Sequence, residues 1–332
     1  MSVEAQQSLF GAVSMGYALI ESERLGDWRR FTEKGLGLHL ECASESLLAF
    51  RMDRHQRRLI VCKGPAEDVA AVGWQLRDEA ALNNLLGRLH ERDIPVEKGR
   101  DSEAALRGVM SFWRLKGPKG LSIELFTQPL TTDAPLRMLS SGFVTGDGGM
   151  GHVAITSRRP EKMLRFWQEL FDARISDRVS EDLAGATLDI TFLRLNERHH
   201  SVAIAATRGL RLDPIRTQVQ HMNMVAASVD DLSNAHQRLR ALGYEMAHDI
   251  GQHPNDREIS FYVISPSGFE MEYGWNALTV NDEARWQATH YHGISLWGHR
   301  PLNSGMRYNL VTNAGNFRRG ARSLLHPEYS PL

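Results

Sequence analysis

Two stretches of this chain, "MGYALIES" at Met15–Ser22 and "MGHVAITS" at Met150–Ser157, are copies of one another placed 135 residues apart. Both start with Met-Gly, continue with the alternation typical of a β-strand and lead into a helical pattern. They differ at the third residue, which is Tyr17 in the first copy and His152 in the second. The chain therefore repeats a structural unit and replaces a phenol with an imidazole inside it.

Three more pairs of segments match in the same order along the chain. They are 48–61 with 192–205, 71–89 with 221–239, and 110–126 with 259–275. Matches that keep one order along the sequence indicate a duplicated domain. Within each copy, the pattern of a strand, a helix and several strands itself occurs twice. One of these helices is marked by apolar residues at helical spacing, Met163, Phe166, Trp167 and Leu170.

These patterns predict an α+β fold of two tandem domains, each built from two βαβββ modules. We expect the strands to form a cupped sheet around a site, with the helices outside. The expected ranges are 1–140 for a structural N-terminal domain, 148–300 for a C-terminal metal-binding domain, and 301–332 for a tail without a recognisable motif. The "GDGG" at 146–149 lacks the Lys-Ser/Thr pair of a phosphate loop and is interpreted as a flexible hinge.

Composition excludes several classes of protein. The net charge is −1 and 24% of residues are charged, so the chain lacks the basic excess of a nucleic-acid-binding protein. No apolar run approaches the roughly 20 residues that a membrane span requires, and no secretory leader is recognisable. Two cysteines outside any CxxC pair predict no disulfide framework, so we expect a cytoplasmic protein.

The alternation of strand residues places chemically reactive side chains on one side of the second domain. Val153 and Ile155 are expected to face the helices, which leaves His152 on the opposite face. The same reasoning puts His221 on that face of a second strand. In a third strand, at 269–273, two glutamates share it. Two imidazoles and a carboxylate from three strands therefore point into the same concave side.

The first copy provides an internal comparison. At the matching positions it has Tyr17, Ala71 and Glu124, so two of the three candidate ligands are missing and its role is expected to be structural. Alternation alone does not choose between Glu270 and Glu272, although the position of Glu124 favours Glu272.

Two imidazoles and one carboxylate leave three positions open around an octahedral ion, which is the facial arrangement of non-haem Fe(II) oxygenases. Structural zinc sites more often have a closed tetrahedral ligand set.

The stretch "GQHPNDREISFYVISPSGFEME", from Gly251 to Glu272, resembles a long family signature. It matches the Gly-x-His, apolar-Tyr, Pro-x-Gly and Glu pattern of the type I extradiol catechol dioxygenases in the vicinal oxygen chelate superfamily, and most resembles the 2,3-dihydroxybiphenyl 1,2-dioxygenases. Ser265 stands where the family usually has Asp, Glu, Asn, Thr or Ala. The resemblance extends over residues 10–300 and implies the glyoxalase–bleomycin-resistance–dioxygenase fold.

The resemblance implies a role for each matching residue. It assigns the metal to His152, His221 and Glu272, which settles the choice between the two glutamates. It also makes His200, the second histidine of "RHH", the acid–base residue. The first of that pair, His199, is expected to face outward.

The family pattern also implies a second group of residues near the substrate. His253 and Tyr262 match the pair that hydrogen-bonds the catechol oxygens. Asn255 and Asp256 match the stretch behind that pair, and Phe192 matches an aromatic residue of the pocket wall.

Other residues receive weaker expectations. Ala154, Asn223 and Ile294 are expected to line the pocket with Phe192, and His299 is a candidate for supporting it. The histidines expected to be solvated are His39, His55, His90, His236 and His248.

The expected function is extradiol cleavage of a hydrophobic, substituted or bicyclic catechol in aromatic catabolism. Catechol and O2 would both bind one Fe(II), with Mn(II) as the alternative metal and no organic cofactor. Family members often form homo-oligomers of two to eight copies, and we expect one here. Two other functions compete with this interpretation: a glyoxalase-like lyase or isomerase of the same superfamily, and a metal-free protein that binds an aromatic ligand.

Overall fold

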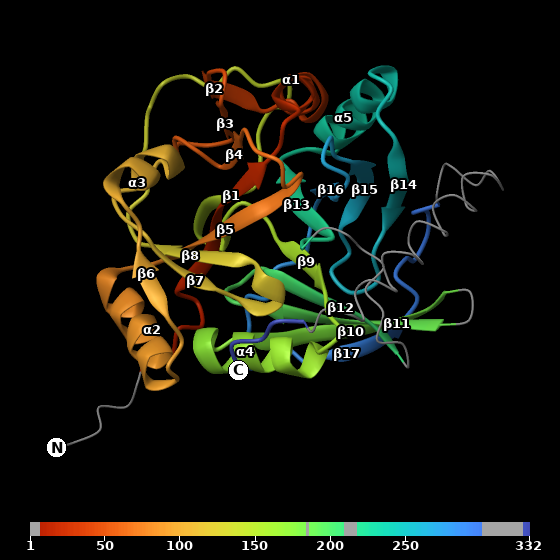
Figure 1. Cartoon of the computed structure of the whole chain (residues 1–332). Helices are drawn as coiled ribbons and strands as arrows, with labels where there is room; N and C mark the ends of the chain where they lie inside the picture. The colour runs from red at the N-terminus through yellow and green to blue at the C-terminus, as the bar shows by residue number, and fades with distance from the viewer. Residues whose placement is uncertain (1–6, 184–185, 209–217, 301–327) are drawn as a thin grey trace.

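The computed structural model describes residues 7–183, 186–208, 218–300 and 328–332, so most of the tail at 301–332 lies outside the described residues. The strands form two mixed sheets, one from each half of the chain (Figure 1). In the part of the chain that the structure describes, no helix has the length and apolar character needed to cross a membrane.

The first sheet has eight strands in the order β2-β3-β4-β1-β5-β8-β7-β6. Its strands are β1 (Val13–Glu21), β2 (His39–Ala43), β3 (Leu47–Arg51), β4 (Leu59–Cys62), β5 (Asp68–Leu76), β6 (Val96–Lys98), β7 (Trp113–Lys116) and β8 (Ser122–Phe126). Its helical segments are α1 (Leu25–Arg29), the π-helix η1 (Arg30–Leu36), α2 (Glu79–Glu91), α3 (Asp101–Arg107) and the 3-10 turn η2 (Pro118–Gly120).

The second sheet has nine strands in the order β14-β15-β16-β13-β9-β12-β11-β10-β17. They are β9 (Val153–Thr156), β10 (Arg174–Leu183), β11 (Ala186–Arg194), β12 (Val202–Arg208), β13 (His221–Ala226), β14 (Met246–Gln252), β15 (Ile259–Ile264), β16 (Glu270–Trp275) and β17 (Thr289–His292). Its helices are α4 (Pro160–Phe171) and α5 (Val229–Ala241). The 3-10 turn η3 (Gly146–Gly148) precedes β9.

Each half contains the predicted pair of βαβββ modules, so the expected fold class is confirmed. The modules are β1–β4 and β5–β8 in the first sheet, and β9–β12 and β13–β16 in the second. In both sheets the first strands of the two modules lie side by side and antiparallel at the centre. Two features interrupt the repeat: α3 is inserted in the first half, and β17 adds an edge strand to the second.

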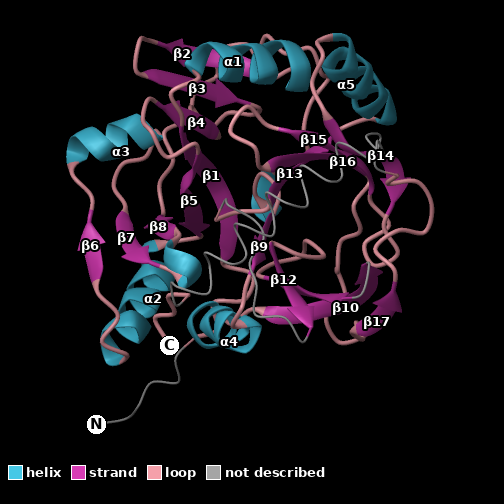
Figure 2. Cartoon of the chain, turned by 45° about the vertical axis from the view of Figure 1, so that its right-hand side comes forward, coloured by secondary structure: helices cyan, strands magenta, loops and turns pink. Residues whose placement is uncertain are grey.

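The helices pack in pairs across the two halves. The π-helical turn after α1 contacts α5 at one end of the molecule, and α2 contacts α4 at the other (Figure 2). Trp74 of β5 packs edge-on against Trp167 of α4, with ring centroids 5.1 Å apart. Apolar side chains that meet across the two halves in this way bury surface that would otherwise face water, which is the dominant stabilising contribution in folding.

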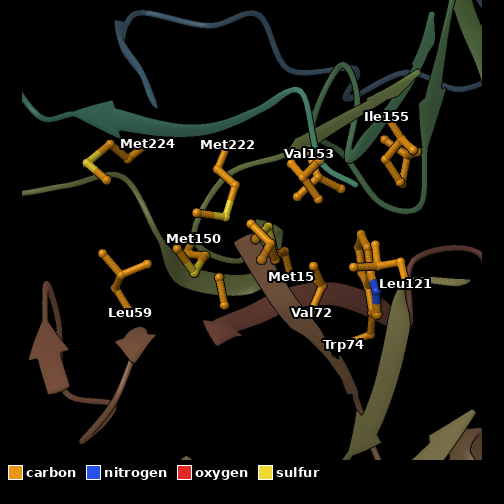
Figure 3. Close-up of a cluster of buried hydrophobic side chains, with 14 of the residues drawn as sticks. Met15, Leu59, Val72, Trp74, Leu121, Met150, Val153, Ile155, Met222 and Met224 are labelled. Carbon is orange, nitrogen blue, oxygen red and sulfur yellow. The ribbon is translucent and has the colours of Figure 1, made fainter. Parts of the chain in front are cut away.

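A single apolar core joins the two sheets. Met15 and Val72 of the first half meet Met150, Val153 and Met222 of the second half in one buried cluster (Figure 3). The strand faces that the alternation assigned to the helices are therefore covered partly by the other half of the chain. The opposite, concave face of the second sheet stays free to line a site.

The segment at 146–149 is part of this junction, and its interpretation as a flexible hinge is wrong. The buried guanidinium of Arg198 donates to the carbonyl oxygens of Val144, Gly148 and Gly149 at 2.8–2.9 Å. Gly149 has a φ of +77°, and a Cβ atom at this position would lie 2.4 Å from the carbonyl oxygen of Met15. The segment is locked because the two halves touch here backbone to backbone.

This contact can be tested with two matched glycine substitutions. Gly149→Ala combines an unfavourable backbone conformation with a clash, so we expect it to lower the free energy of unfolding by more than about 3 kcal/mol. Gly146→Ala also has a positive φ, +71°, but meets no atom within 4 Å, so a loss of only about 1–2 kcal/mol is expected. Urea unfolding of both variants measures the difference, and equal losses would contradict the proposed clash.

Candidate metal centre

Three neighbouring strands of the second sheet carry the predicted metal ligands. His152 lies directly before β9, His221 opens β13 and Glu272 lies within β16, next to β13 in the sheet. The Nε2 atom of His152 is 3.2 Å from Nε2 of His221 and 3.0 Å from Oε2 of Glu272. The Nε2 atom of His221 is 3.4 Å from the same carboxylate oxygen. The structure therefore brings the three side chains to one point.

The donor atoms fit a divalent ion. Ligands about 2.1 Å from an ion and at right angles to one another lie about 3 Å apart, close to the spacing seen here. Oε2 of Glu272 is buried and makes no hydrogen bond among the described residues. A buried carboxylate oxygen left without a partner is costly, and a cation at this point would remove that cost.

The ionisation states also suit metal binding. Burial lowers the pKa of His221 to about 3, so its ring is neutral at physiological pH. Burial opposes ionisation of Glu272, but the imidazoles of His152 and His253 hold its pKa well below the ordinary value. A neutral imidazole and an ionised carboxylate are the forms that coordinate metals.

Glu270 does not join this group. The converging ligand atoms come from His152, His221 and Glu272, and burial raises the pKa of Glu270 to about 7.

The other oxygen of Glu272 binds the two residues expected to hold the substrate. Tyr262 donates its hydroxyl hydrogen to Oε1 at 2.7 Å, and His253 Nε2 lies 2.8 Å from the Tyr262 oxygen and 3.2 Å from Oε1. His253 is oriented by its other nitrogen, Nδ1, which is 2.7 Å from the carbonyl oxygen of Ile294. Although burial favours the neutral ring, the nearby Glu272 raises the pKa of His253 to about 9.

His200 lies against the ligand His152, with ring centroids 3.9 Å apart. Phe192 covers another side of its ring edge-on at 4.8 Å. Burial, assisted by the charges that His152 and His199 can carry, holds the pKa of His200 well below the ordinary value. Asp256 places Oδ2 3.7 Å from His200 Nδ1, so this predicted residue lies beside the imidazole of His200.

An apolar cavity of about 260 Å³ opens over the three candidate ligands. Its wall contains the predicted Phe192, Ala154 and Ile294, together with Asn255 and Asp256. Further apolar lining residues are Val179, Leu188, Ile190, Ala203 and Ala205.

The expectation for Asn223 is wrong. Its amide donates to Glu258, and it lines a second cavity of about 250 Å³ on the other side of His152 and His200.

Several histidines lie where the sequence did not suggest. His199 is buried, although we expected it to face outward, because the pair His199–His200 lies in the loop between β11 and β12, where strand alternation does not apply. His236 is buried against Asp249 and His248 lines the apolar cavity, although both were expected to be solvated. His299, which was a candidate for supporting the pocket, lines the same cavity. The sequence feature that could have predicted a buried His199 is its adjacency to His200, because two neighbouring histidines in a loop can both turn inward.

Comparisons with known proteins identify the family of this chain. The family model of the Glyoxalase/Bleomycin resistance protein/Dioxygenase superfamily matches residues 149–273, and that of the dihydroxybiphenyl dioxygenase BphC D1 domain matches residues 15–64. The biphenyl-2,3-diol 1,2-dioxygenase of Metapseudomonas furukawaii is 32% identical over 87% of this chain and 94% of that protein. The chain belongs to the extradiol dioxygenase family. This confirms the predicted family and its oxygen-inserting, ring-cleaving chemistry.

Other extradiol dioxygenases match over similar lengths. The 3-methylcatechol 2,3-dioxygenase of Pseudomonas putida is 31% identical over 86% of this chain and 97% of that protein. The crystal structure of BphC, a halotolerant catechol dioxygenase, superposes with a TM-score of 0.78 and 28% identity, covering 88% of this chain and 95% of that one. A second solved structure, of a catechol 2,3-dioxygenase, has a TM-score of 0.79 and 27% identity.

In this extradiol dioxygenase, the corresponding position of the first half is filled by protein. Tyr17 donates its hydroxyl hydrogen to Oε2 of the buried Glu124 at 2.6 Å. Arg107, from the inserted helix α3, pairs with both oxygens of the same carboxylate. The guanidinium of Arg107 thus takes the place next to Glu124 that an ion would need.

Removal of this guanidinium should destabilise the protein. Arg107→Met would leave the Glu124 carboxylate buried without its cation, so we expect a loss of about 3–5 kcal/mol in the free energy of unfolding. The matched control is Arg100→Met, near the start of the same helix, whose exposed ion pair with Glu103 should change stability by less than about 1 kcal/mol. Urea unfolding measures both, and an unchanged Arg107→Met variant would refute this assignment.

Metal retention tests the candidate ligands directly. His152→Ala removes one donor of three, so the purified, Fe(II)-reconstituted variant should hold less than about a tenth of the wild-type iron while keeping its circular dichroism spectrum. The exposed His90 of α2 offers a control, because His90→Ala should retain full iron content. Elemental analysis after gel filtration gives the iron content. Full retention in His152→Ala would exclude this residue as a ligand.

Proposed function

We propose that this extradiol dioxygenase binds Fe(II) through His152, His221 and Glu272 and cleaves a hydrophobic, substituted or bicyclic catechol beside its diol. The observation that carries the proposal is the convergence of two imidazole nitrogens on one unpartnered carboxylate oxygen within 3.0–3.4 Å. Two nitrogens and one oxygen on one side of an ion are the ligand set of non-haem Fe(II) oxygenases.

When bound, the iron would supply a common site at which catechol and O2 meet and exchange electrons, so that two reactants react as one bound assembly. His253 and Tyr262 would hold the two catechol oxygens, since both already place hydrogen-bonding groups within 3.2 Å of Glu272 Oε1. The apolar walls would exclude water from the ring during the reaction.

His200 would act as the proton-transfer residue. It is the buried imidazole beside His152 that does not belong to the candidate ligand set, and it borders both the apolar cavity and the second cavity, which Asn223 lines. Burial favours its neutral form, which can take a proton from the substrate and return it to an oxygen that leaves.

The substrate class follows from the cavity. Its volume of about 260 Å³ is at the small end of ligand pockets, and the surface of its walls is mostly apolar. These features favour a catechol that carries one alkyl group or one further aromatic ring over a polycyclic steroid catechol.

We also propose that the protein works in the cytoplasm and as a homo-oligomer. Its two cysteines, Cys42 and Cys62, are both free, which suits a reducing compartment. The homo-oligomer follows from the family resemblance.

Anaerobic reconstitution followed by oxygen uptake tests the proposed activity. With Fe(II), we expect O2 consumption matched by a yellow product, and a higher kcat/KM for 2,3-dihydroxybiphenyl and 3-methylcatechol than for unsubstituted catechol. Reconstitution with Mn(II) in parallel identifies the working metal. His200→Gln should lower kcat about 10²- to 10⁴-fold because proton transfer is lost, whereas His90→Gln should leave it unchanged. Lack of oxygen uptake with every catechol and both metals would refute the proposal.

A further inference from the structure

Three buried side chains form a hydrogen-bonded chain that ends at His200. Oδ2 of Asp177, on β10, lies 2.7 Å from Nε2 of His199. The other nitrogen of that ring, Nδ1, lies 3.1 Å from Nδ1 of His200. All three residues are at most 6% exposed, so water does not compete for these hydrogen bonds.

The order of the chain determines where its protons lie. An ionised carboxylate only accepts hydrogen bonds, so His199 must donate Nε2–H to Asp177. A neutral His199 then has a bare Nδ1, which can only accept. His200 must therefore carry its proton on Nδ1, and its Nε2 is left bare as an acceptor.

Neighbouring elements hold Asp177 and His199 in place. The backbone N–H of Thr289, at the start of β17, donates to the second oxygen of Asp177 at 2.6 Å. The Trp286 ring packs edge-on against the His199 imidazole, with ring centroids 5.6 Å apart. The strand β17, which has no counterpart in the first half, thus orients the carboxylate.

Asp256 is the competing carboxylate. Its Oδ2 atom is 3.7 Å from His200 Nδ1, which is too long for a hydrogen bond, and its Oδ1 atom accepts the backbone N–H of Glu258 at 3.0 Å. At 3.1 Å, His199 is therefore the partner that sets the orientation of the His200 ring.

We propose that Asp177 and His199 are positioning residues that hold His200 in the tautomer with a free Nε2. This inference rests on the proposed role of His200 in proton transfer. A carboxylate that fixes the tautomer of a catalytic imidazole is an established device in enzymes, and the loss of such outer partners typically costs about 10- to 100-fold in activity. In this protein, the carboxylate of Asp177 acts on His200 through a second imidazole, that of His199.

Asp177→Asn reverses the hydrogen-bond order without changing the shape of the side chain. The amide oxygen must accept the N–H of Thr289, so the amide nitrogen faces His199 Nε2 and donates to it. His199 then carries its proton on Nδ1 and donates to His200, whose own proton moves to Nε2. We expect kcat to fall about 10- to 100-fold with unchanged KM and iron content.

Two further variants separate positioning from folding. Ser176→Ala removes an equally buried hydrogen bond, which the Ser176 hydroxyl donates to the backbone carbonyl oxygen of His199. The hydrogen bonds that join Asp177, His199 and His200 stay intact, so kcat should remain at the wild-type value. His199→Asn keeps an oxygen that can accept from His200 Nδ1–H, whereas His199→Leu does not. Activity should therefore be largely rescued in the Asn variant and low in the Leu variant.

The tautomer can be measured without turnover. In metal-free protein labelled with ¹⁵N in the histidine rings, long-range ¹⁵N–¹H spectra should assign the His200 proton to Nδ1 in the wild type and to Nε2 in Asp177→Asn. A wild-type proton on Nε2, or an Asp177→Asn enzyme with wild-type kcat, would overturn this inference. If the wild type itself cleaves no catechol, the proposed function fails, and the NMR result still decides the tautomer.

Discussion

The site is organised around one buried carboxylate. Glu272 is 1% exposed. Burial of an ionised carboxylate destabilises a protein strongly unless the charge is paired or hydrogen-bonded. One of its oxygens faces the imidazoles of His152 and His221, and the other accepts a hydrogen bond from Tyr262. The candidate metal ligands and the candidate substrate-binding pair are therefore linked through the same side chain.

The duplicated half solves the same electrostatic problem with protein groups alone. Glu124 occupies the position that corresponds to Glu272, and the guanidinium of Arg107 and the hydroxyl of Tyr17 satisfy its two oxygens. The fold thus buries a glutamate at this place twice. In the first half, the inserted helix α3 supplies a permanent cation, the guanidinium of Arg107. In the second half, a cavity lined by imidazoles lies beside Glu272. The two halves therefore differ in the group that faces the buried glutamate, which is a guanidinium in the first half and a pair of imidazoles in the second.

Rigid surroundings place these groups accurately. The three candidate ligands lie on or next to strands in the middle of a nine-stranded sheet, whose outer face is packed against the first half in a shared core. Strands held on one face by packing position side chains better than loops do. His200 lies in a loop, and the hydrogen bonds from Asp177 through His199 provide the support that a strand would otherwise give.

The sequence by itself determined the duplication, the βαβββ modules and the side of the sheet on which His152, His221 and Glu272 lie. These are local properties, because strand alternation and helical spacing are set by the backbone geometry of each element. Only the tertiary structure decided that His199 turns inward to Asp177, that Asn223 faces a second cavity and that the glycine segment at 146–149 is locked by Arg198. Loops have no period from which a direction can be read, and contacts between the two halves depend on residues far apart in the chain.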